Sequence, residues 1–250
     1  MKALITGSSC GLGKEIAIYL DELGYETILV ARDIYNLNEV KNQLKNKCKV
    51  INKDLSKVEE VYSLYEEIKN EDIDIVVNNA GIGEYGYFLD IDVNKEISMI
   101  NLNITSVHIL TKLFLQKMTK VNKGRILNIS SLSGFSYGPL MASYYATKSY
   151  VTSLTCSIYK ELKVKKSKVK ISCCCPGPIE TNFNNSLDIK FSNKPLKASF
   201  VAKYTIDKCL KNKLIIIPGI KNKIAKICVK FLPIKWILSI NYNIQMKKVK

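Results

Sequence analysis

The sequence predicts an α/β fold in which a parallel, doubly wound sheet of seven strands has helices on both faces. Short apolar runs alternate with longer amphipathic runs, as in repeated βαβ units. The segment Ile73–Val77 is apolar almost throughout, which is typical of a strand that is covered on both faces. A length of 250 residues with 47% hydrophobic residues fits one domain with a substantial core.

Each expected strand is a short apolar run. These runs are Ala3–Thr6, Thr27–Ala31, Lys49–Asn52, Ile73–Asn78, Arg125–Ser130, Lys170–Cys175 and Leu214–Pro218. The helical stretches between them include Gly13–Leu23, Glu59–Lys69, Thr105–Met118 and Ser143–Leu162. No repeat, low-complexity tract or linker divides the chain, so we expect one domain over residues 1–250. In such sheets ligands bind at the carboxyl ends of the strands, so functional residues are expected there.

The cysteines and the histidine do not predict a metal site. Cys173, Cys174 and Cys175 are adjacent in a predicted strand, so neighbouring thiols point to opposite faces, and no CxxC pair occurs. His108, the single histidine, lies in an apolar helical stretch where packing is the simpler role. Reduced, buried thiols and the absence of a signal-peptide pattern after Met1 predict a cytoplasmic protein.

The formal net charge of +16 comes largely from lysines in two segments. One segment is Lys160–Lys170, and the other is the tail after Asp207, which contains no acidic residue. No basic recognition motif interleaved with aromatic residues occurs, so a nucleic-acid partner is not expected. A solvated lysine-rich surface is the simplest interpretation, and attraction to phosphorylated cofactors or anionic lipid is the alternative.

A glycine cluster separates the first predicted strand from the first predicted helix, over Thr6–Gly13. Glycines allow a sharp turn and a close approach to a pyrophosphate, and the helix N-terminus then presents free N–H groups to the anion. This context predicts a Rossmann-type dinucleotide site. The expected contacts in the loop are Gly7, Ser9, Gly11, Leu12 and Gly13.

The loop spacing T-G-x-x-x-G-x-G resembles that of the short-chain dehydrogenase/reductase family, and further matches follow in the order of that family over residues 1–181. They are Asp54-Leu55, Asn78-Asn79-Ala80-Gly81, Asn101, Ser130-Ser131, Tyr144-x-x-x-Lys148 and Pro176-Gly177-Pro178-Ile179-Glu180-Thr181. The resemblance implies that Asp54 and Leu55 frame the adenine. It also implies that Asn79, Ala80 and Gly81 steady the sheet beside the cofactor. By itself, Asn before a turn would be ordinary turn chemistry.

The same resemblance implies contacts at the nicotinamide end of the cofactor. Ile179 and Thr181 would contact the carboxamide, and Pro176 and Gly177 belong to the same segment. A small-molecule carbonyl or alcohol is the implied substrate, and the implied assembly is a homodimer or a homotetramer.

Tyr144 and Lys148 stand four residues apart on a predicted helix, so their side chains share a face. A nearby ammonium, with the charge of an oxidised nicotinamide, is expected to lower the pKa of the phenol. Tyr144 would then act as general acid and base, while Ser131, thirteen residues earlier, polarises the carbonyl. Tyr145 is a rival proton donor, but the family register selects Tyr144.

The resemblance also implies a proton relay through an asparagine in the central helix. Asn101 is the expected residue, where it would hold a water that links Lys148 to solvent. Asn103 is the alternative.

The end of the second predicted strand indicates which nicotinamide cofactor binds. An acidic residue there would bind the ribose 2′-hydroxyl and repel a 2′-phosphate, but the sequence has Ala31 followed by Arg32. A guanidinium can bind a phosphate through two donors, which favours NADP(H). Asp33 leaves NAD(H) open, because it could take the acidic role if the register differs by two residues.

Residues 182–250 are expected to form a substrate lid and a C-terminal amphipathic segment. Asn182–Ala198 is polar and fits a lid. In Ile220–Ile244, lysines and apolar residues occupy opposite helical faces until Pro233 interrupts the pattern. A helix that packs on the core or closes an apolar pocket is the favoured interpretation. Peripheral contact with a membrane or a partner subunit is the alternative, and recurring lysines argue against a membrane span.

These features together predict an NADP(H)-dependent oxidoreductase that interconverts a carbonyl compound and an alcohol. Its substrate is expected to be partly apolar. A membrane-surface reductase of lipid-like ketones is the first alternative. A non-catalytic dinucleotide-binding sensor is the second, and loss of Asn101, Ser131, Tyr144 or Lys148 would have favoured it.

Overall fold

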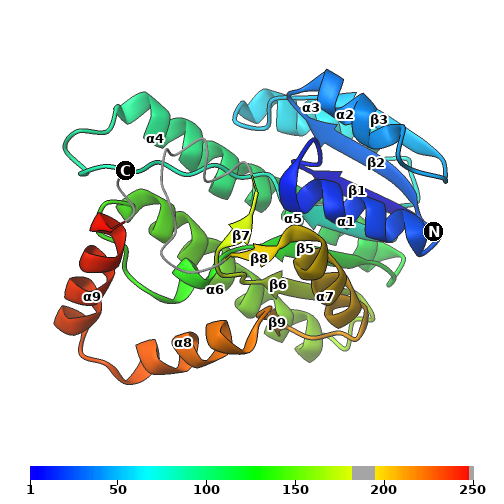
Figure 1. Cartoon of the computed structure of the whole chain (residues 1–250). Coiled ribbons are helices and arrows are strands. Elements are labelled where there is room, and N and C mark those ends of the chain that lie inside the picture. Colours follow the sequence, from blue (N-terminus) through cyan, green and yellow to red (C-terminus); the bar gives the residue numbers. More distant parts are fainter. Residues whose placement is uncertain (182–194, 248–250) are drawn as a thin grey trace.

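The computed structural model describes residues 1–181 and 195–247 and contains the predicted parallel sheet (Figure 1). Within these residues seven parallel strands lie in the order β3-β2-β1-β4-β5-β6-β9. The order reverses between β1 and β4, which is where doubly wound sheets bind ligands. The strands are β1 (Lys2–Thr6), β2 (Glu26–Ala31), β3 (Cys48–Asn52), β4 (Ile75–Asn78), β5 (Arg125–Ile129), β6 (Lys170–Cys174) and β9 (Ile215–Ile216). A separate parallel pair consists of β7 (Ile179–Glu180) and β8 (Leu196–Lys197).

Helices connect the strands on both faces of the sheet (Figure 1). They are α1 (Gly11–Glu22), α2 (Ile34–Lys41), α3 (Val58–Ile68), α4 (Val93–Ile100), α5 (Ser106–Lys120), α6 (Ala142–Val164), α7 (Ala198–Leu210), α8 (Ile220–Phe231) and α9 (Ile234–Met246). A π-helical turn, Asn101–Thr105, joins α4 to α5, and a 3-10 turn, Leu132–Phe135, follows β5. The helices predicted after the first, third, fourth and fifth strands are therefore present.

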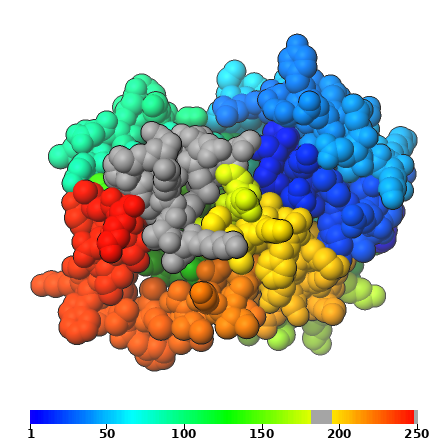
Figure 2. Space-filling model, viewed as in Figure 1, coloured from blue at the N-terminus to red at the C-terminus, as the bar shows by residue number. Residues whose placement is uncertain are grey.

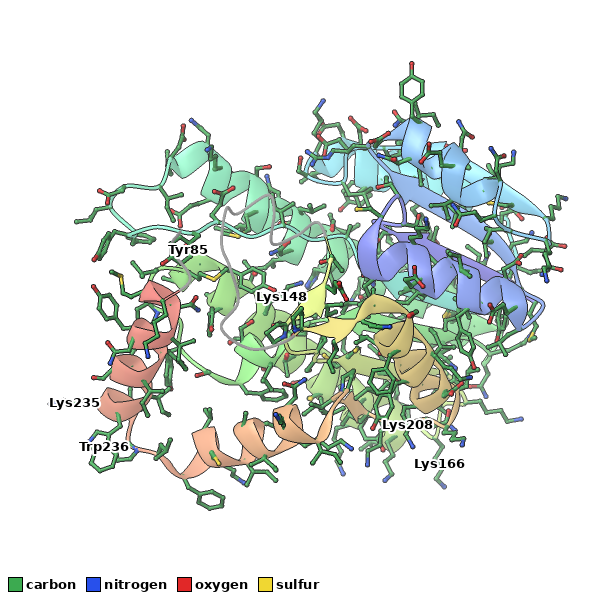
Figure 3. The ribbon with its side chains drawn as sticks, viewed as in Figure 1. Tyr85, Lys148, Lys166, Lys208, Lys235 and Trp236 are labelled. Carbon is green, nitrogen blue, oxygen red and sulfur yellow. The ribbon has the colours of Figure 1, made fainter. Side chains whose placement is uncertain are left out.

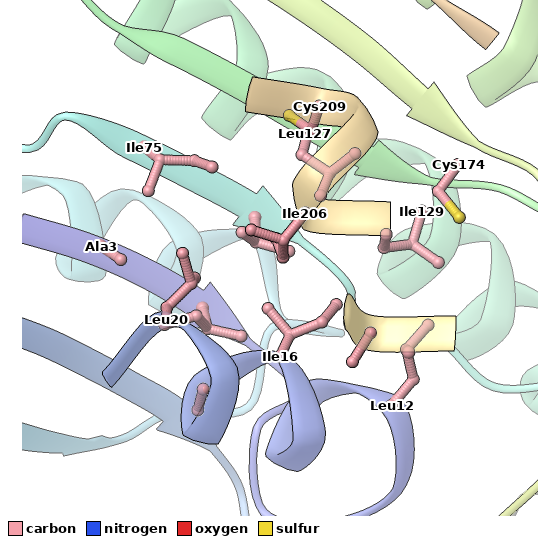
Figure 4. Packing of buried hydrophobic residues seen from close by; sticks show 14 of the residues in the cluster. Ala3, Leu12, Ile16, Leu20, Ile75, Leu127, Ile129, Cys174, Ile206 and Cys209 are labelled. Carbon is pink, nitrogen blue, oxygen red and sulfur yellow. The ribbon is translucent and has the colours of Figure 1, made fainter. Parts of the chain in front are cut away.

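Two hydrophobic cores lie on opposite faces of the sheet because successive strand side chains alternate between faces. In β1, Ala3 and Ile5 belong to the core beneath α1, α2 and α7, whereas Leu4 belongs to the core beneath α3, α5 and α6. Figure 4 shows the first core, where Ile16 of α1 and Ile206 of α7 meet the sheet. Because helices cover both faces of the sheet, the ends of the strands remain accessible.

The adjacent cysteines follow the same alternation, as predicted. The Cys173 and Cys175 sulfurs lie 3.6 Å apart on one face. The Cys174 Sγ lies 3.1 Å from Thr205 Oγ1 on the other. All three are free and buried, and they act as small apolar side chains of the core.

The chain after β6 departs most from the prediction. The seventh strand is only Ile215–Ile216, paired with Cys173 and Cys174, where Leu214–Pro218 was expected. Pro233 separates α8 from α9 as predicted. Packing of α8 on the core was a wrong expectation, because each of its residues is at least partly exposed.

The two last helices run along one margin of the molecule, coloured orange and red in Figure 2. No helix in residues 1–181 or 195–247 has the length and apolarity that crossing a bilayer requires. Most of the predicted lid, residues 182–194, lies outside the described residues.

Candidate active site

A cavity of about 810 Å³ lies at the carboxyl ends of β1, β2, β4, β5 and β6. The residues predicted to contact a dinucleotide border this cavity, with Gly13 as the exception. Those residues are Gly7, Ser9, Gly11, Leu12, Arg32, Asp54, Leu55, Asn79, Ala80, Gly81, Tyr144, Lys148, Pro176, Gly177, Ile179 and Thr181. Segments far apart in the sequence therefore meet at the edge of the sheet where ligands were expected.

The glycine loop between β1 and α1 forms a cradle for an anion. Gly7 and Gly11 have φ angles of +64° and +55°, which glycine adopts without the strain of a side chain. A Cβ on Gly13 would collide with the carbonyl oxygen of Gly7, so Gly13 packs beneath the loop. Cys10, which precedes α1, gives no side-chain cap, so the first N–H groups of the helix can bind an anion. The loop thus fits the pyrophosphate of a dinucleotide.

Two asparagines at the end of β4 connect the sheet to this loop. The Asn79 Nδ2 donates to the carbonyl oxygens of Thr6 (3.0 Å) and Gly7 (2.9 Å). The buried Asn78 donates to Asn128 Oδ1 at 2.8 Å. Ordinary turn chemistry does not require these long-range bonds. Asn79 therefore holds the glycine loop in place.

The ends of β2 and β3 place two cations, Arg32 and Lys53, and two carboxylates, Asp33 and Asp54, at the cavity. The Asp33 carboxylate caps α2 by accepting hydrogen bonds from the Asn36 backbone N–H (3.0 Å) and from its side-chain amide. The backbone bond from Asn36 is the main cause that lowers the pKa of Asp33. The Asp33 carboxylate is thus engaged in a cap, and Asp33 and Arg32 both border the cavity.

Ser131, Tyr144 and Lys148 border the cavity together, as the motif predicts. Ser131 follows β5, while Tyr144 and Lys148 lie on α6. The Lys148 ammonium donates to the carbonyl oxygen of Ile129 at 3.2 Å and lies 5.8 Å from the centre of the Tyr144 ring. Figure 3 shows Lys148 in the interior of the molecule. Ser131 also hydrogen bonds with Tyr144.

Burial dominates the electrostatics of Tyr144 and Lys148. Burial raises the pKa of Tyr144 to about 12, although hydrogen bonds from Ser131 and Ser133 lower it. Burial also lowers the pKa of Lys148 to about 8. The predicted lowering of the phenol pKa combined the Lys148 ammonium with the charge of an oxidised nicotinamide, whereas the protein's own groups raise this pKa. The reason is that desolvation penalises the phenolate more than its neighbours stabilise it.

Tyr145, the rival proton donor, has a different partner. Its hydroxyl accepts a hydrogen bond from Gln245 Nε2 of α9 at 3.0 Å. Tyr145 thus holds the C-terminal helix at the cavity wall, whereas Tyr144 bonds with Ser131. This arrangement favours Tyr144 as the proton donor.

The relay asparagine stays a prediction, and the geometry favours Asn103, the alternative, over Asn101. Asn103 is fully buried, and its side chain bonds with the backbone N–H (3.0 Å) and the carbonyl (2.8 Å) of Ile82. A Cβ placed on Gly81 would lie 3.1 Å from Asn103 Oδ1 and 3.3 Å from Lys148 Nζ. Asn101 begins the π-helical turn two residues earlier and points from another side of the helix.

Helical periodicity was the signal that could have selected Asn103. The buried residues Met99, Val107 and Leu110 recur on the face that also carries Asn103. Asn101 does not share this spacing.

Helices α8 and α9 complete the cavity wall. Residues of one α8 face and of the end of α9 border the cavity beside Phe135, Met141 and Tyr145. These are Lys221, Asn222, Ala225, Lys226, Val229, Asn241 and Ile244. The expectation that this segment closes an apolar pocket is thus partly right. No local motif marks these residues, because their role depends on where Pro233 turns the chain.

Comparisons with known proteins agree with this geometry. Residues 1–190 match the family model described as short chain dehydrogenase. The chain is 32% identical over 225 residues to dehydrogenase/reductase SDR family member 11 of Homo sapiens, which covers 84% of this chain and 83% of that protein.

Two solved structures share the fold. A short-chain dehydrogenase from Sphingobium yanoikuyae in complex with NADPH has a TM-score of 0.82 and 21% identity, covering 93% of this chain and 96% of that one. One from Burkholderia phymatum in complex with NAD has a TM-score of 0.81 and 22% identity, covering 90% and 91%. The chain therefore belongs to the short-chain dehydrogenase/reductase family and is an oxidoreductase of the class that acts on CH–OH groups with NAD(P).

Proposed function

We propose that the protein is an NADP(H)-dependent oxidoreductase that interconverts a ketone or aldehyde with its alcohol, using Tyr144 as general acid and base. One observation carries the proposal. Ser131, Tyr144 and Lys148 border the same cavity as the glycine loop after β1. A proton donor, a hydrogen-bond donor for the carbonyl and an anion cradle therefore share one site.

Each residue has a defined task in the reductive direction. The dinucleotide, when bound, supplies the hydride. Tyr144 donates its phenolic proton to the carbonyl oxygen, and Ser131 donates a hydrogen bond to the same oxygen. The Lys148 ammonium, 5.8 Å from the ring centre, stabilises the phenolate that remains. Asn103, in place of Asn101, positions Lys148 through the Ile82 backbone and Gly81.

The protonated state of Tyr144 suits the reductive direction. A pKa of about 12 keeps the phenol protonated at neutral pH, as a general acid requires. The alkoxide that forms is a stronger base than a phenolate, so this proton transfer is favourable. In oxidation Tyr144 must first lose its proton, which the same burial opposes.

The charge at the end of β2 supports NADP(H) as the cofactor. Arg32 and Lys53 border the cavity there, and Asp33 is engaged in the cap of α2. Two cations attract a 2′-phosphate, whereas a free carboxylate would repel it. NAD(H) is the alternative, because Asp33 also borders the cavity.

The cavity wall supports a partly apolar substrate. Phe135, Met141, Val229 and Ile244 border the cavity, together with polar residues such as Lys226 and Asn241. An apolar portion of a ketone would bury itself against these side chains, while its carbonyl reaches Ser131 and Tyr144.

The test is a screen of ketosteroids, 3-ketoacyl thioesters, quinones and sugars with NADPH, followed by its absorbance and by identification of the alcohol. We expect ketones with an apolar body to be reduced and free sugars to react poorly. If NADPH binds but none of these carbonyl compounds is reduced and none of their alcohols is oxidised, a non-catalytic dinucleotide-binding protein is the better description.

A further inference from the structure

The last two helices, Ile220–Met246, form a bent arm that we call the elbow. In α8, the residues Ile220, Ile224, Ile227 and Phe231 recur along one side and are 75%, 54%, 58% and 78% exposed. The residues Asn222, Ala225 and Val229 occupy the opposite side and border the cavity. Ile220 and Ile224 of this stripe thus border neither cavity, whereas Ile227 and Phe231 also border a second cavity inside the elbow. This arrangement reverses the usual orientation of a surface helix.

The elbow is held firmly despite this exposure. The Tyr85 hydroxyl donates to the carbonyl oxygen of Gln245 at 2.9 Å. The Asn241 side chain donates to Ser136 Oγ at 2.9 Å and to the Tyr137 carbonyl at 2.6 Å. The end of α9 is therefore bonded to the wall of the active site. The exposed stripe belongs to an anchored element rather than to a free tail.

The elbow carries positive charge beside its apolar residues. Lys221 flanks the α8 stripe on one side, and Lys223 and Lys230 flank it on the other. Lys235 and Trp236, the latter 64% exposed, project from the outer side of α9 (Figure 3). No acidic residue follows Asp207 anywhere in the sequence.

This combination selects one occupant for the outer face. In a symmetric contact between two copies, the lysines of one elbow would face those of the other, with no carboxylate on either to neutralise them. A bilayer that contains anionic lipids supplies the opposite charge and an apolar layer for the stripe. Tryptophan suits the boundary between headgroups and acyl chains.

The elbow also encloses a second cavity next to the active-site cavity. A second cavity, of about 600 Å³, lies inside the elbow between its apolar residues and Tyr137. Phe135, Lys226 and Val229 border both this cavity and the main one. These three side chains separate the two cavities, so their displacement would connect the outer helices with the site of Tyr144.

We propose that the elbow docks on the surface of an anionic lipid bilayer and admits lipid-like carbonyl substrates to the cavity from that surface. The docking stands by itself, whereas the delivery of substrate rests on the proposed reductase function. The apolar stripe enters the interface, the lysines bind lipid headgroups, and Pro233 sets the bend that keeps the second cavity open towards the bilayer.

The docking is tested by flotation of the full chain with vesicles of phosphatidylcholine alone or with phosphatidylserine added. We expect binding to the anionic vesicles only, weakened by salt. The variant Ile220→Ser/Ile224→Ser/Trp236→Ser should bind at least about tenfold more weakly. The variant Lys223→Gln/Lys230→Gln/Lys235→Gln should lose on the order of a hundredfold, at roughly fivefold per lysine.

Two matched variants control for hydrophobicity and charge. Tyr35→Ser/Val121→Ser/Val164→Ser removes three exposed apolar side chains elsewhere on the surface. Lys163→Gln/Lys165→Gln/Lys168→Gln removes three lysines of the other basic segment. Both should bind anionic vesicles within about twofold of the unmodified chain, because surface substitutions away from the contact have small effects. Equal losses in the control and elbow variants would overturn the proposal.

Two further outcomes contradict docking. One is that the unmodified chain binds anionic and neutral vesicles equally or not at all. The other is that the apolar elbow variant dissociates a dimer in sedimentation experiments, which would make the outer face a contact between copies.

The delivery is tested by turnover of a short water-soluble ketone and of a long-chain ketone held in anionic vesicles. The apolar elbow variant should keep the first and lose the second. Equal retention of both would overturn delivery. Vesicle binding without turnover of either ketone would leave docking supported and contradict the proposed reductase function instead.

Discussion

The two ends of this chain use similar amphipathic helices in opposite ways. In the first region, residues 1–181, and in α7, apolar helix residues such as Ile16 and Ile206 are fully buried against the sheet. In the elbow, Ile220 and Phe231 are more than 70% exposed, and the opposite side of α8 borders the cavity. An apolar stripe therefore indicates that something covers a helix, but not whether the cover is the protein itself.

The two regions differ because different contacts hold their helices in position. Strands β1 and β4 to β6 place the glycine loop, Asn79, Ser131 and the segment after Cys175 at a common edge of the sheet. The elbow follows a two-residue edge strand and has no neighbouring strand to define its position. Its orientation depends on a few contacts, of which the Gln245 bonds are the clearest.

Tyr144→Phe is expected to have the largest effect. It tests the active site that the strands of residues 1–181 hold in position. The phenyl ring keeps its packing but removes the proton donor. Turnover should fall about 10²–10⁴-fold, while the dissociation constant for NADPH changes little. Steady-state kinetics and cofactor titration measure the two quantities. Tyr145→Phe should cost much less, at most about tenfold, because it removes only the bond to Gln245. The reverse order would move the acid to Tyr145.

A pair of isoleucine substitutions tests the packing contrast directly. Ile206→Ala leaves a hole in the core beneath α7 and should lower the free energy of unfolding by about 2–5 kcal/mol. Ile224→Ala, at a position that is 54% exposed, should change it by less than about 0.5 kcal/mol. Chemical denaturation of both variants measures the difference. A large loss at Ile224 would show that α8 packs on the protein.

The double variant Ala31→Asp/Arg32→Ala tests the cofactor preference. It replaces a guanidinium by a carboxylate beside the expected 2′-phosphate. A charge-assisted hydrogen bond contributes about 1.5–3 kcal/mol, so the ratio of kcat/KM for NADPH over NADH should fall tens-fold or more. The change should be larger at low salt.

Asp33→Asn is the control for this variant, because asparagine can also cap α2. The preference for NADPH should stay within about threefold. A strong preference of the unmodified enzyme for NADH, abolished by Asp33→Asn, would make Asp33 the selector.

Asn103→Ala and Asn101→Ala distinguish the two candidate asparagines. Loss of the Asn103 side chain leaves the Ile82 backbone groups without their buried partners, and should cost about 1–3 kcal/mol of unfolding free energy. It should also lower kcat more than it raises KM, since Lys148 loses its alignment. Asn101→Ala should stay within about 0.5 kcal/mol. Equal effects on kcat would return Asn101 to consideration.

The smallest expected effect is the pH dependence set by Lys148. Its pKa is lowered to about 8, so its ammonium is present at pH 7 and is lost as the pH rises through 8. The reductive kcat should therefore fall with increasing pH above about 8, by up to about tenfold per pH unit. In Lys148→Arg the guanidinium stays charged, so a slower but pH-independent rate is expected above pH 8. A falling rate in both variants would assign the decline to another group.

The fold and most of the site could be predicted, because the apolar runs mark the strands and the motif residues follow them directly in the sequence. Strands covered on both faces are apolar throughout, and motif residues that follow them must meet at one edge, as Gly7, Asn79 and Ser131 do. The raised pKa of Tyr144 could not be predicted, since it depends on burial by distant segments.

The relay asparagine and the cavity-facing side of α8 could not be predicted in the same way. Asn101 stays the predicted relay residue, although the helical spacing with Met99 and Val107 favours Asn103. The inward face of α8 mixes Lys226, Asn222 and Val229, so no periodicity marks it. A homodimer or homotetramer, a cytoplasmic location and a lid over Asn182–Ala198 stay predictions.

The most direct test of the central claim follows the hydride itself. The unmodified enzyme would be given a ketone selected in the carbonyl screen and NADPH deuterated on its nicotinamide ring, in ordinary water. Mass spectrometry of the alcohol should find deuterium on the former carbonyl carbon, whereas the hydroxyl proton comes from Tyr144 and ultimately from solvent. An alcohol without deuterium on that carbon for either face of the labelled ring would contradict direct transfer within the cavity.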